Sequence, residues 1–191
     1  MKLIETVEKV RACDLCGKDL DLGPRPVIQV HESARILISG QAPGIKVHRS
    51  GVPFDDASGE RLRLWMGIDR ATFYDPTQIA ILPMGFCYPG KGTSGDLPPQ
   101  KRCAATWRQD LLDQLTNIRL NLVIGIYAQQ WHLQRTDLNL TETVRCWQEF
   151  GEGIMPLPHP SPRNNIWLKK NPWFEKDIVP ALQTRVVSAL G

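Results

Sequence analysis

The chain has 191 residues, of which 42% are hydrophobic and 23% charged, a composition ordinary for a soluble globular protein. No apolar run approaches the roughly 20 residues that a membrane-spanning helix needs, and the acidic N-terminal residues do not resemble a signal peptide. The net charge of +3 permits contact with nucleic acid but does not require it. We therefore expect a single domain over residues 1–191, in a reducing, cytoplasmic compartment and without membrane contact.

Helical and strand-like patterns alternate along the chain. Residues 2–12 and 103–116 place apolar side chains at helical spacing, a helix is expected to start at a Ser58 cap, and another covers the C-terminal residues. Four short apolar runs are predicted to be buried strands: residues 34–39, 79–82, 120–126 and 154–157. Apolar strands that alternate with helices predict an α/β fold, a three-layer α/β/α arrangement with a central, mainly parallel four-stranded sheet.

Three loops rich in Gly, Pro and polar residues leave the carboxyl ends of these predicted strands. They are Gly40–Gly59, Pro83–Cys103 and Pro158–Asn165. Because ligand sites of parallel sheets form at this edge, we expect the three loops to converge on one site.

Four of the five cysteines form two spaced pairs. Cys13 and Cys16 lie near the start, whereas Cys87 and Cys103 bracket a Gly- and Pro-rich loop about 70 residues later. Thiolates are soft ligands that select zinc or an iron–sulfur cluster, and a reducing compartment disfavours disulfides. The spacing favours one four-thiolate metal centre that includes an N-terminal arm, with two unrelated cysteine pairs as the alternative. Cys146 lies outside both pairs and is interpreted as a buried or spare thiol.

Two further residues have sequence neighbours that suit a binding or catalytic site. Phe54, between a proline and two aspartates, can offer a ring face to a planar group or can enter the core. His159 lies between two prolines, which hold the backbone stiffly on both sides of it. Such rigidity suits a site residue, although a single histidine is more often structural.

The loops carry recognisable segments. Residues 40–44 read Gly-Gln-Ala-Pro-Gly, residues 51–59 read Gly-Val-Pro-Phe-Asp-Asp-Ala-Ser-Gly, and residues 159–162 read His-Pro-Ser-Pro. Together with the cysteine spacing, and in this order, they resemble the motifs of the uracil-DNA glycosylase superfamily. The resemblance is greatest to its iron–sulfur branch, usually called family four, and it covers about residues 10–165.

The resemblance implies a DNA glycosylase of base excision repair, with a uracil-DNA glycosylase-like domain. Such an enzyme flips uracil or another deaminated or damaged base out of DNA and hydrolyses its N-glycosidic bond. By this resemblance His159 donates to the departing base, Phe54 stacks on that base, and Gln41 orients a water. The expected base-binding residues are Ala42, Gly44, Phe54 and Pro83.

The resemblance also implies contacts outside the base pocket. Ser161, Arg163 and Asn164 are expected to contact DNA, with Arg163 either filling the vacated stack or pairing with phosphate. The thiols of Cys13, Cys16, Cys87 and Cys103 would hold a 4Fe-4S cluster, or zinc as the alternative, in a structural role. DNA is the expected partner, and the chain is expected to act as a monomer.

Two positions depart from the family pattern. Gln41 stands where family four has a glutamate, and the aspartate of the best-known branch would fall at Ala42, so neither carboxylate is present. Pro83 replaces an asparagine that reads uracil in the family, so the base need not be uracil. His48 is a candidate substitute base, or else part of a solvated basic loop that touches phosphate. A non-catalytic nucleic-acid-binding protein and a hydrolase of free nucleosides or nucleotides remain the alternatives.

Overall fold

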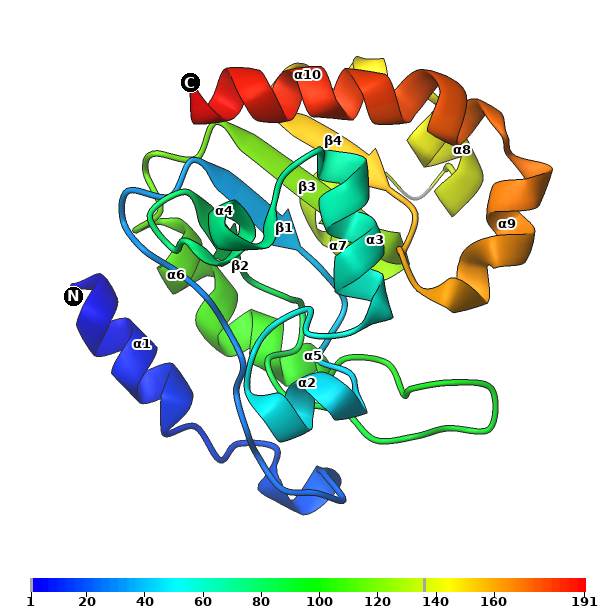
Figure 1. The fold of residues 1–191 in the computed structure, drawn as a ribbon. Coiled ribbons are helices and arrows are strands. Elements are labelled where there is room, and N and C mark those ends of the chain that lie inside the picture. The colour runs from blue at the N-terminus through cyan, green and yellow to red at the C-terminus, as the bar shows by residue number, and fades with distance from the viewer. Residues whose placement is uncertain (1, 136) are drawn as a thin grey trace.

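The computed structural model describes residues 2–135 and 137–191, whose centre is a four-stranded sheet (Figure 1). All three strand pairs are parallel, and the strand order is β2-β1-β3-β4. The strands are β1 (Ile36–Ser39), β2 (Ile79–Ile81), β3 (Leu120–Ile124) and β4 (Ile154–Leu157). Nearly every strand residue is buried, because helices cover both faces of the sheet. The predicted three-layer α/β/α fold is confirmed.

One face of the sheet carries the larger apolar core. Ile36 and Ile38 of β1 point into it, and so does Leu122 of β3, because alternate strand residues face the same side. The helices that cover this face are α3 (Ala57–Met66), α4 (Arg70–Tyr74), α8 (Leu140–Arg145) and α10 (Val179–Leu190). Figure 1 shows α10 running along the length of the sheet on this side.

The opposite face packs against the N-terminal helix and the middle of the chain. Leu37 of β1 and Leu82 contact Val10 and Leu111 there. The elements on this side are α1 (Leu3–Arg11), α5 (Lys101–Cys103), the π-helical turn η2 (Ala104–Arg108), α6 (Gln109–Leu112) and α7 (Gly125–Leu133). A π-turn widens a helix by one residue and often marks a functional position.

The remaining elements are short and connect these layers. They are η1 (Gly17–Asp19), α2 (Ile45–Ser50), η3 (Trp147–Phe150), η4 (Pro162–Asn164), α9 (Asn165–Lys170) and the π-helical turn η5 (Phe174–Ile178).

Local details differ from the sequence prediction. The stretch 40–59, predicted as loop throughout, contains helix α2, which ends at Gly51 with a left-handed φ of 75°. Helix α3 is capped by Asp56 rather than Ser58, since the Asp56 carboxylate accepts a hydrogen bond from the Gly59 amide at 2.9 Å. The third strand ends at Ile124, because Gly125 takes a φ of 79° and begins α7.

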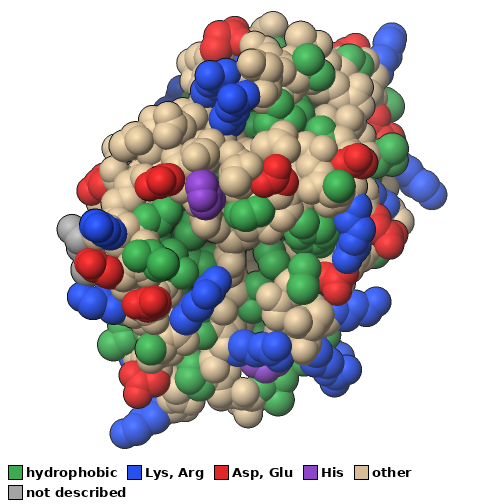
Figure 2. Space-filling model, turned by 60° about the vertical axis from the view of Figure 1, so that its left-hand side comes forward, with side chains coloured by type: hydrophobic (Ala, Val, Ile, Leu, Met, Phe, Trp, Pro, Cys, Tyr) green, Lys and Arg blue, Asp and Glu red, His purple; other side chains and the backbone are tan. Residues whose placement is uncertain are grey.

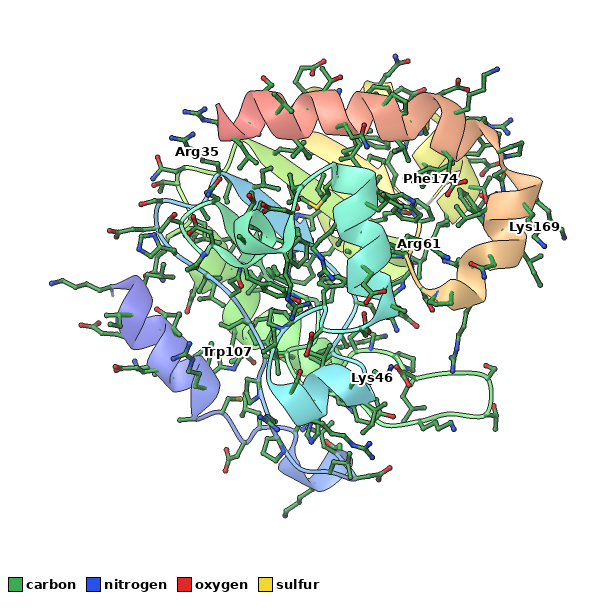
Figure 3. The ribbon with its side chains drawn as sticks, viewed as in Figure 1. Arg35, Lys46, Arg61, Trp107, Lys169 and Phe174 are labelled. Atoms are coloured by element: carbon green, nitrogen blue, oxygen red, sulfur yellow. The ribbon has the colours of Figure 1, made fainter. Side chains whose placement is uncertain are left out.

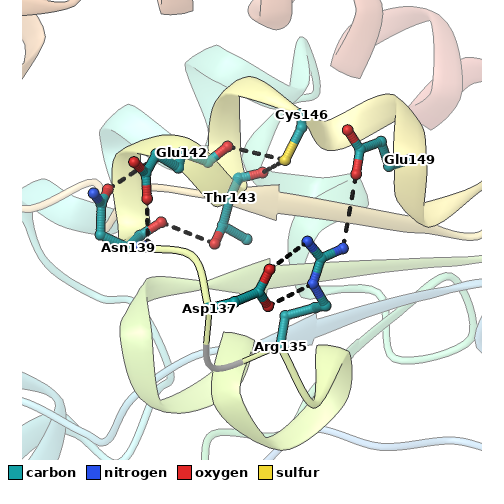
Figure 4. Close-up of polar contacts among 7 residues, drawn as sticks. All are labelled: Arg135, Asp137, Asn139, Glu142, Thr143, Cys146 and Glu149. Atoms are coloured by element: carbon teal, nitrogen blue, oxygen red, sulfur yellow. Dashed lines mark hydrogen bonds and ion pairs between the residues drawn. The ribbon is translucent and has the colours of Figure 1, made fainter.

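Cys146 lies far from the other thiols in the chain, at the end of α8 (Figure 4). Its sulfur contacts the carbonyl oxygen of Glu142 at 3.0 Å. Asn139 and Glu142 form a reciprocal capping box at the start of α8. Arg135 joins this region to Asp137 and Glu149 through ion pairs. Cys146 is half-buried, and its interpretation as a buried or spare thiol stays a prediction.

Across the described residues, no helix is both long and apolar enough to span a bilayer.

Candidate active site

A cavity of about 580 Å³ opens at the carboxyl ends of the strands. The three loops expected to converge all contribute to its wall, which includes Gln41, Phe54, Pro83 and His159. Backbone hydrogen bonds hold the first two loops together: the Met84 amide donates to the Gly40 carbonyl and the Gly85 amide to that of Gln41, both at 2.9 Å. The strand ends therefore form a fixed floor for the cavity. Of the other predicted base and DNA contacts, the lining includes Ala42, Gly44, Ser161, Arg163 and Asn164.

Phe54 is held in a strained backbone conformation at the cavity wall. Its φ is 54°, a left-handed value that is uncommon for a bulky residue. A Cβ on Gly59 would lie 1.8 Å from the Phe54 carbonyl oxygen, so only glycine fits there. The ring lies over Gly40 and meets Phe73 edge-on with ring centroids 6.1 Å apart. Phe54 thus contacts the core and the cavity together.

The loop after β4 fixes the ring of His159. Its Nδ1 accepts a hydrogen bond from the Ser161 amide at 3.1 Å, so in the neutral ring the proton lies on Nε2. Burial lowers the pKa of His159, and the nearby Asp56 and Asp96 only partly oppose this effect. The imidazole is therefore neutral at physiological pH, with an N–H group that has no hydrogen-bond partner among the described residues.

Side chains from two elements fasten this loop. The Asn164 side-chain amide donates to the His159 carbonyl at 2.7 Å. Arg61, which α3 directs toward the loop (Figure 3), donates to the carbonyls of Pro160 and Ser161 at 3.3 and 3.2 Å. Arg61 also binds the Asn165 side chain at 2.8 Å. Arg61 was not predicted from the sequence, since nothing in its spacing distinguishes it from Arg63, the other basic residue of α3.

Charged groups of both signs surround the cavity mouth. Lys46 of α2 is one of the lining residues, and Arg163 reaches from the last loop to the Ser94 carbonyl at 3.4 Å. Asp56 and Asp96 also line the cavity, and the sequence analysis singled out neither. Both lie in loops expected to converge, so a search for acidic residues in those loops would have found them.

His48 does not belong to the cavity lining. Its ring faces Tyr88, with ring centroids 6.0 Å apart. Burial and the nearby Arg25 and Arg49 lower its pKa. The side chain projects from α2, the helix that the sequence prediction overlooked, and helical geometry turns it away from the cavity that Gly44 and Val47 line. His48 is thus poorly placed to act as the substitute base.

The four paired cysteines line a second, much smaller pocket between the N-terminal arm and the start of α5. Two N–H groups point at sulfur: the Trp107 indole donates to Cys13 and the Phe86 amide to Cys103, each at 3.3 Å. Burial raises the pKa of Cys87 to about 11 and of Cys103 to about 12, with smaller contributions from the other thiols. As free thiols they stay protonated at neutral pH, and a bound metal would be needed to hold them as thiolates.

The donor set is chemically suited to a soft metal centre. Cys13, Cys16, Cys87 and Cys103 line one pocket, and thiolates are the ligands of both zinc and iron–sulfur clusters. Within residues 2–135 and 137–191, no three His, Cys, Asp or Glu side chains are arranged to hold one metal ion.

A buried polar network lies beneath the floor of the cavity. Arg108, on the π-turn η2, is fully buried and donates to the carbonyls of Leu82 and Pro83 at 2.7 and 2.9 Å. It also binds Ser39 Oγ at 2.7 Å and His132 Nε2 at 2.8 Å. The network thus joins the ends of β1 and β2. Sequence patterns did not indicate it, because charged residues are rarely fully buried.

The charge on the surface is mixed. On the face in Figure 2, lysine and arginine side chains are interspersed with acidic ones rather than gathered in one broad patch. An anionic polymer on this face would thus be held by local contacts rather than by one broad basic patch.

A known protein family matches most of the chain. The family model described as Uracil DNA glycosylase superfamily matches residues 28–183. The matched range includes all four strands and every residue that lines the cavity except Val27.

Proposed function

The chain belongs to the uracil DNA glycosylase superfamily, and from this premise we propose that it is a DNA glycosylase of base excision repair. It would accept a flipped-out, altered base and hydrolyse the N-glycosidic bond of that base. The observation that supports this most directly is the neutral His159 ring, whose unpartnered Nε2–H borders the same cavity as Phe54.

The geometry suggests how the bond is broken. As the bond between C1′ and the base nitrogen lengthens, its electron pair moves onto the base and negative charge develops on the oxygen of the base. His159 is placed to donate from Nε2 to that oxygen, and a preorganised donor of this kind is worth about 10²–10³-fold in rate. A neutral donor suits this step because it keeps its proton while the anion departs.

Phe54 would offset the cost of base flipping. Extruding a base costs a few kcal/mol, and stacking on an aromatic ring returns about 1–3 kcal/mol. The ring is already ordered by Phe73 and by the close approach of Gly59 to its backbone, so little entropy is lost on binding.

The walls of the cavity bear on which base is accepted. Pro83 carries no side-chain amide, and its carbonyl already accepts from buried Arg108. The described strand-end residues 40–44 and 81–83 form the cavity floor. Among them, only Gln41 carries a carboxamide side chain. We propose that uracil is one candidate among deaminated or otherwise altered bases.

DNA contacts would come from the rim. Ser161, Arg163 and Asn164 line the mouth, and Arg163 spans it to Ser94. On DNA binding, the exposed Arg163 guanidinium would exchange the Ser94 carbonyl for a phosphate or would fill the vacated stack.

We further propose that the protein belongs to the iron–sulfur branch and that Cys13, Cys16, Cys87 and Cys103 would hold a 4Fe-4S cluster. When bound, such a cluster would supply a cross-link between the N-terminal arm and the loop after β2, and no redox step is needed for hydrolysis. Anaerobically purified protein should contain iron and sulfide in equal amounts; one zinc per chain would contradict the assignment. Cys103→Ser should lose the iron, whereas Cys146→Ser is the matched control and should retain it.

The proposed activity is tested with an oligonucleotide panel. Duplex and single-stranded substrates with uracil, hypoxanthine, xanthine or alkylated bases are incubated with protein, and abasic sites are revealed by alkaline cleavage. At least one substrate should be cut by the wild type and spared by His159→Ala.

A second candidate function is non-catalytic nucleic-acid binding. It is favoured by the absence of a carboxylate at both Gln41 and Ala42. Tight binding to DNA with every substrate left intact would support it over the enzyme.

A further inference from the structure

Hydrolysis of a glycosidic bond requires an acceptor for a proton of the attacking water. Neither Gln41 nor Ala42 can take that proton. Among the residues that line the cavity in the described chain, only two carry a carboxylate, Asp56 and Asp96.

Asp56 has a structural task. One of its oxygens accepts from the Gly59 amide at 2.9 Å and caps α3, at the turn where Gly59 lies against the Phe54 backbone. A carboxylate at this end of a helix is also stabilised by the helix dipole. Its loss would disturb the wall that holds Phe54.

Asp96 lies next to the turn after β1, in which Gln41 and Ala42 stand where related proteins have a carboxylate. Its Oδ2 is 3.7 Å from the position that a Cβ on Gly44 would take, in the same turn after β1 that carries Gln41 and Ala42. Burial lowers the pKa of His159, and the charges of Asp56 and, more weakly, of Asp96 oppose that effect. The Asp96 carboxylate lies in the lining of the cavity that the imidazole borders.

A short hairpin delivers Asp96 to this place. The Leu97 amide donates to the Gly90 carbonyl at 2.9 Å, and Lys91 and Asp96 form an isolated bridge. The hairpin lies between Cys87 and Cys103, so the thiol pocket anchors both of its ends. Asp96 remains open to solvent at the cavity mouth, where a water can reach it.

We propose, on the basis of the glycosylase function above, that Asp96 is a catalytic carboxylate. After the base leaves with the bonding electron pair, the oxygen of a water oriented by Gln41 bonds to C1′. One proton of that water passes to the Asp96 carboxylate, which later returns it to solvent. The products are an abasic site and the free base, and the base takes up a proton from solvent. The catalytic carboxylate of this chain would thus lie on the cysteine-bracketed hairpin, and not in the turn after β1, where related proteins carry it.

The test measures single-turnover cleavage of the substrate found in the panel. Asp96→Asn should lower the rate by about 10²-fold or more, because general base catalysis contributes about 10²–10⁴-fold. Asp96→Glu should keep part of the rate, and added sodium formate should partly restore Asp96→Ala. A merely structural role would give no rescue by formate.

Two controls separate chemistry from folding and binding. Asp21→Asn removes a carboxylate that lies against the same hairpin, 3.5 Å from the position of a Gly90 Cβ, but outside the cavity lining, and should leave the rate unchanged. Affinity for a duplex with the 2′-fluoro analogue of the nucleotide that the panel identifies, whose glycosidic bond resists cleavage, should be unchanged or higher in Asp96→Asn, because a negative charge near phosphate is lost.

The outcomes are distinct. If wild type is active and His159→Ala inactive while Asp96→Asn cleaves at the wild-type rate, Asp96 is not catalytic and the glycosylase function stands. If Asp96→Asn is slow but formate never rescues Asp96→Ala and binding is lost, the role is structural and the inference is overturned. If wild type cleaves no substrate, the glycosylase function itself fails and this inference with it.

Discussion

His159 and His132 are both partly enclosed histidines whose burial lowers the pKa, yet they belong to regions with different tasks. His132 lies under the cavity floor with both ring nitrogens engaged, Nε2 with Arg108 at 2.8 Å and Nδ1 with the Asn121 side chain at 3.2 Å. His159 has Nδ1 engaged by the Ser161 amide, while its Nε2–H borders the cavity.

Under the proposed function, burial and a lowered pKa do not by themselves mark a functional histidine, because both rings share them. A ring with both nitrogens hydrogen-bonded inside the protein has no nitrogen left to contact a substrate. A ring held by one hydrogen-bonded nitrogen, with the other nitrogen free, is preorganised to contact a substrate. The expected consequences of mutation therefore separate into activity for the first region and stability for the second.

The largest effect is expected for His159→Ala. Cleavage of the preferred substrate should fall by about 10²–10³-fold, because the donor to the departing base is lost. The midpoint of urea unfolding should change little, since the ring contributes one local hydrogen bond. Rapid-quench measurement of single turnovers would check the rate; an undiminished rate would contradict the assigned role.

His132→Ala should act in the opposite way. It leaves one N–H of Arg108 Nη2 and one of the Asn121 side-chain amide without their His132 partner, and each unsatisfied buried group costs about 1–3 kcal/mol. Urea denaturation should show this loss of unfolding free energy. The rate of the chemical step at a temperature where the variant is folded should stay within a few-fold of wild type. A collapse of the rate in folded protein would remove the distinction between the two histidines.

The pH dependence of stability sharpens the same comparison. Burial, with a further contribution from the charge on Arg108, lowers the pKa of His132 from 6.5 to about 3. Between these values the unfolded chain binds a proton that the folded chain does not. The stabilisation is thus complete above pH 6.5 and is lost as the pH falls, by up to about 1.4 kcal/mol per pH unit from this group. His132→Ala should show a shallower slope than wild type in urea titrations at successive pH values.

The smallest effect is expected for Asn164→Ala. It removes the 2.7 Å hydrogen bond from the side-chain amide to the His159 carbonyl, worth about 0.5–1.5 kcal/mol net. Because the Arg61 contacts remain, the cleavage rate should fall only a few-fold. A loss as large as that of His159→Ala would mean that this one contact positions the whole loop.

The apolar runs predicted the strands well, because strands covered on both faces must be apolar throughout. The strand predicted for residues 154–157 has the same limits in the structure. Helix α2 was missed, since its six residues are mostly polar and are preceded by a Gly-Pro-rich turn. The cap at Asp56 instead of Ser58 is a two-residue error of the kind that a run of capping residues produces.

The convergence of the three loops could be predicted from strand topology, but the orientation of individual side chains could not. His48 and Asp96 lie in two of those loops, and only Asp96 lines the cavity. The direction of the His48 side chain depends on the turn of a short helix, and that of the Asp96 side chain depends on a hairpin. Neither feature produces a pattern in the spacing of hydrophobic residues. Arg108 escaped notice because its burial depends on carbonyls from strands distant in sequence.

The interior position of Arg108 has an electrostatic consequence for the cavity above it. Its pKa is lowered to about 9 by burial, so the guanidinium keeps its charge at neutral pH. None of the ion pairs found in the described parts of the chain involves it. A cation without a carboxylate partner in a low-dielectric interior projects a positive potential through the Pro83 peptide that forms the floor. An anionic base that departs into this cavity would be stabilised by that field before any solvent ion arrives.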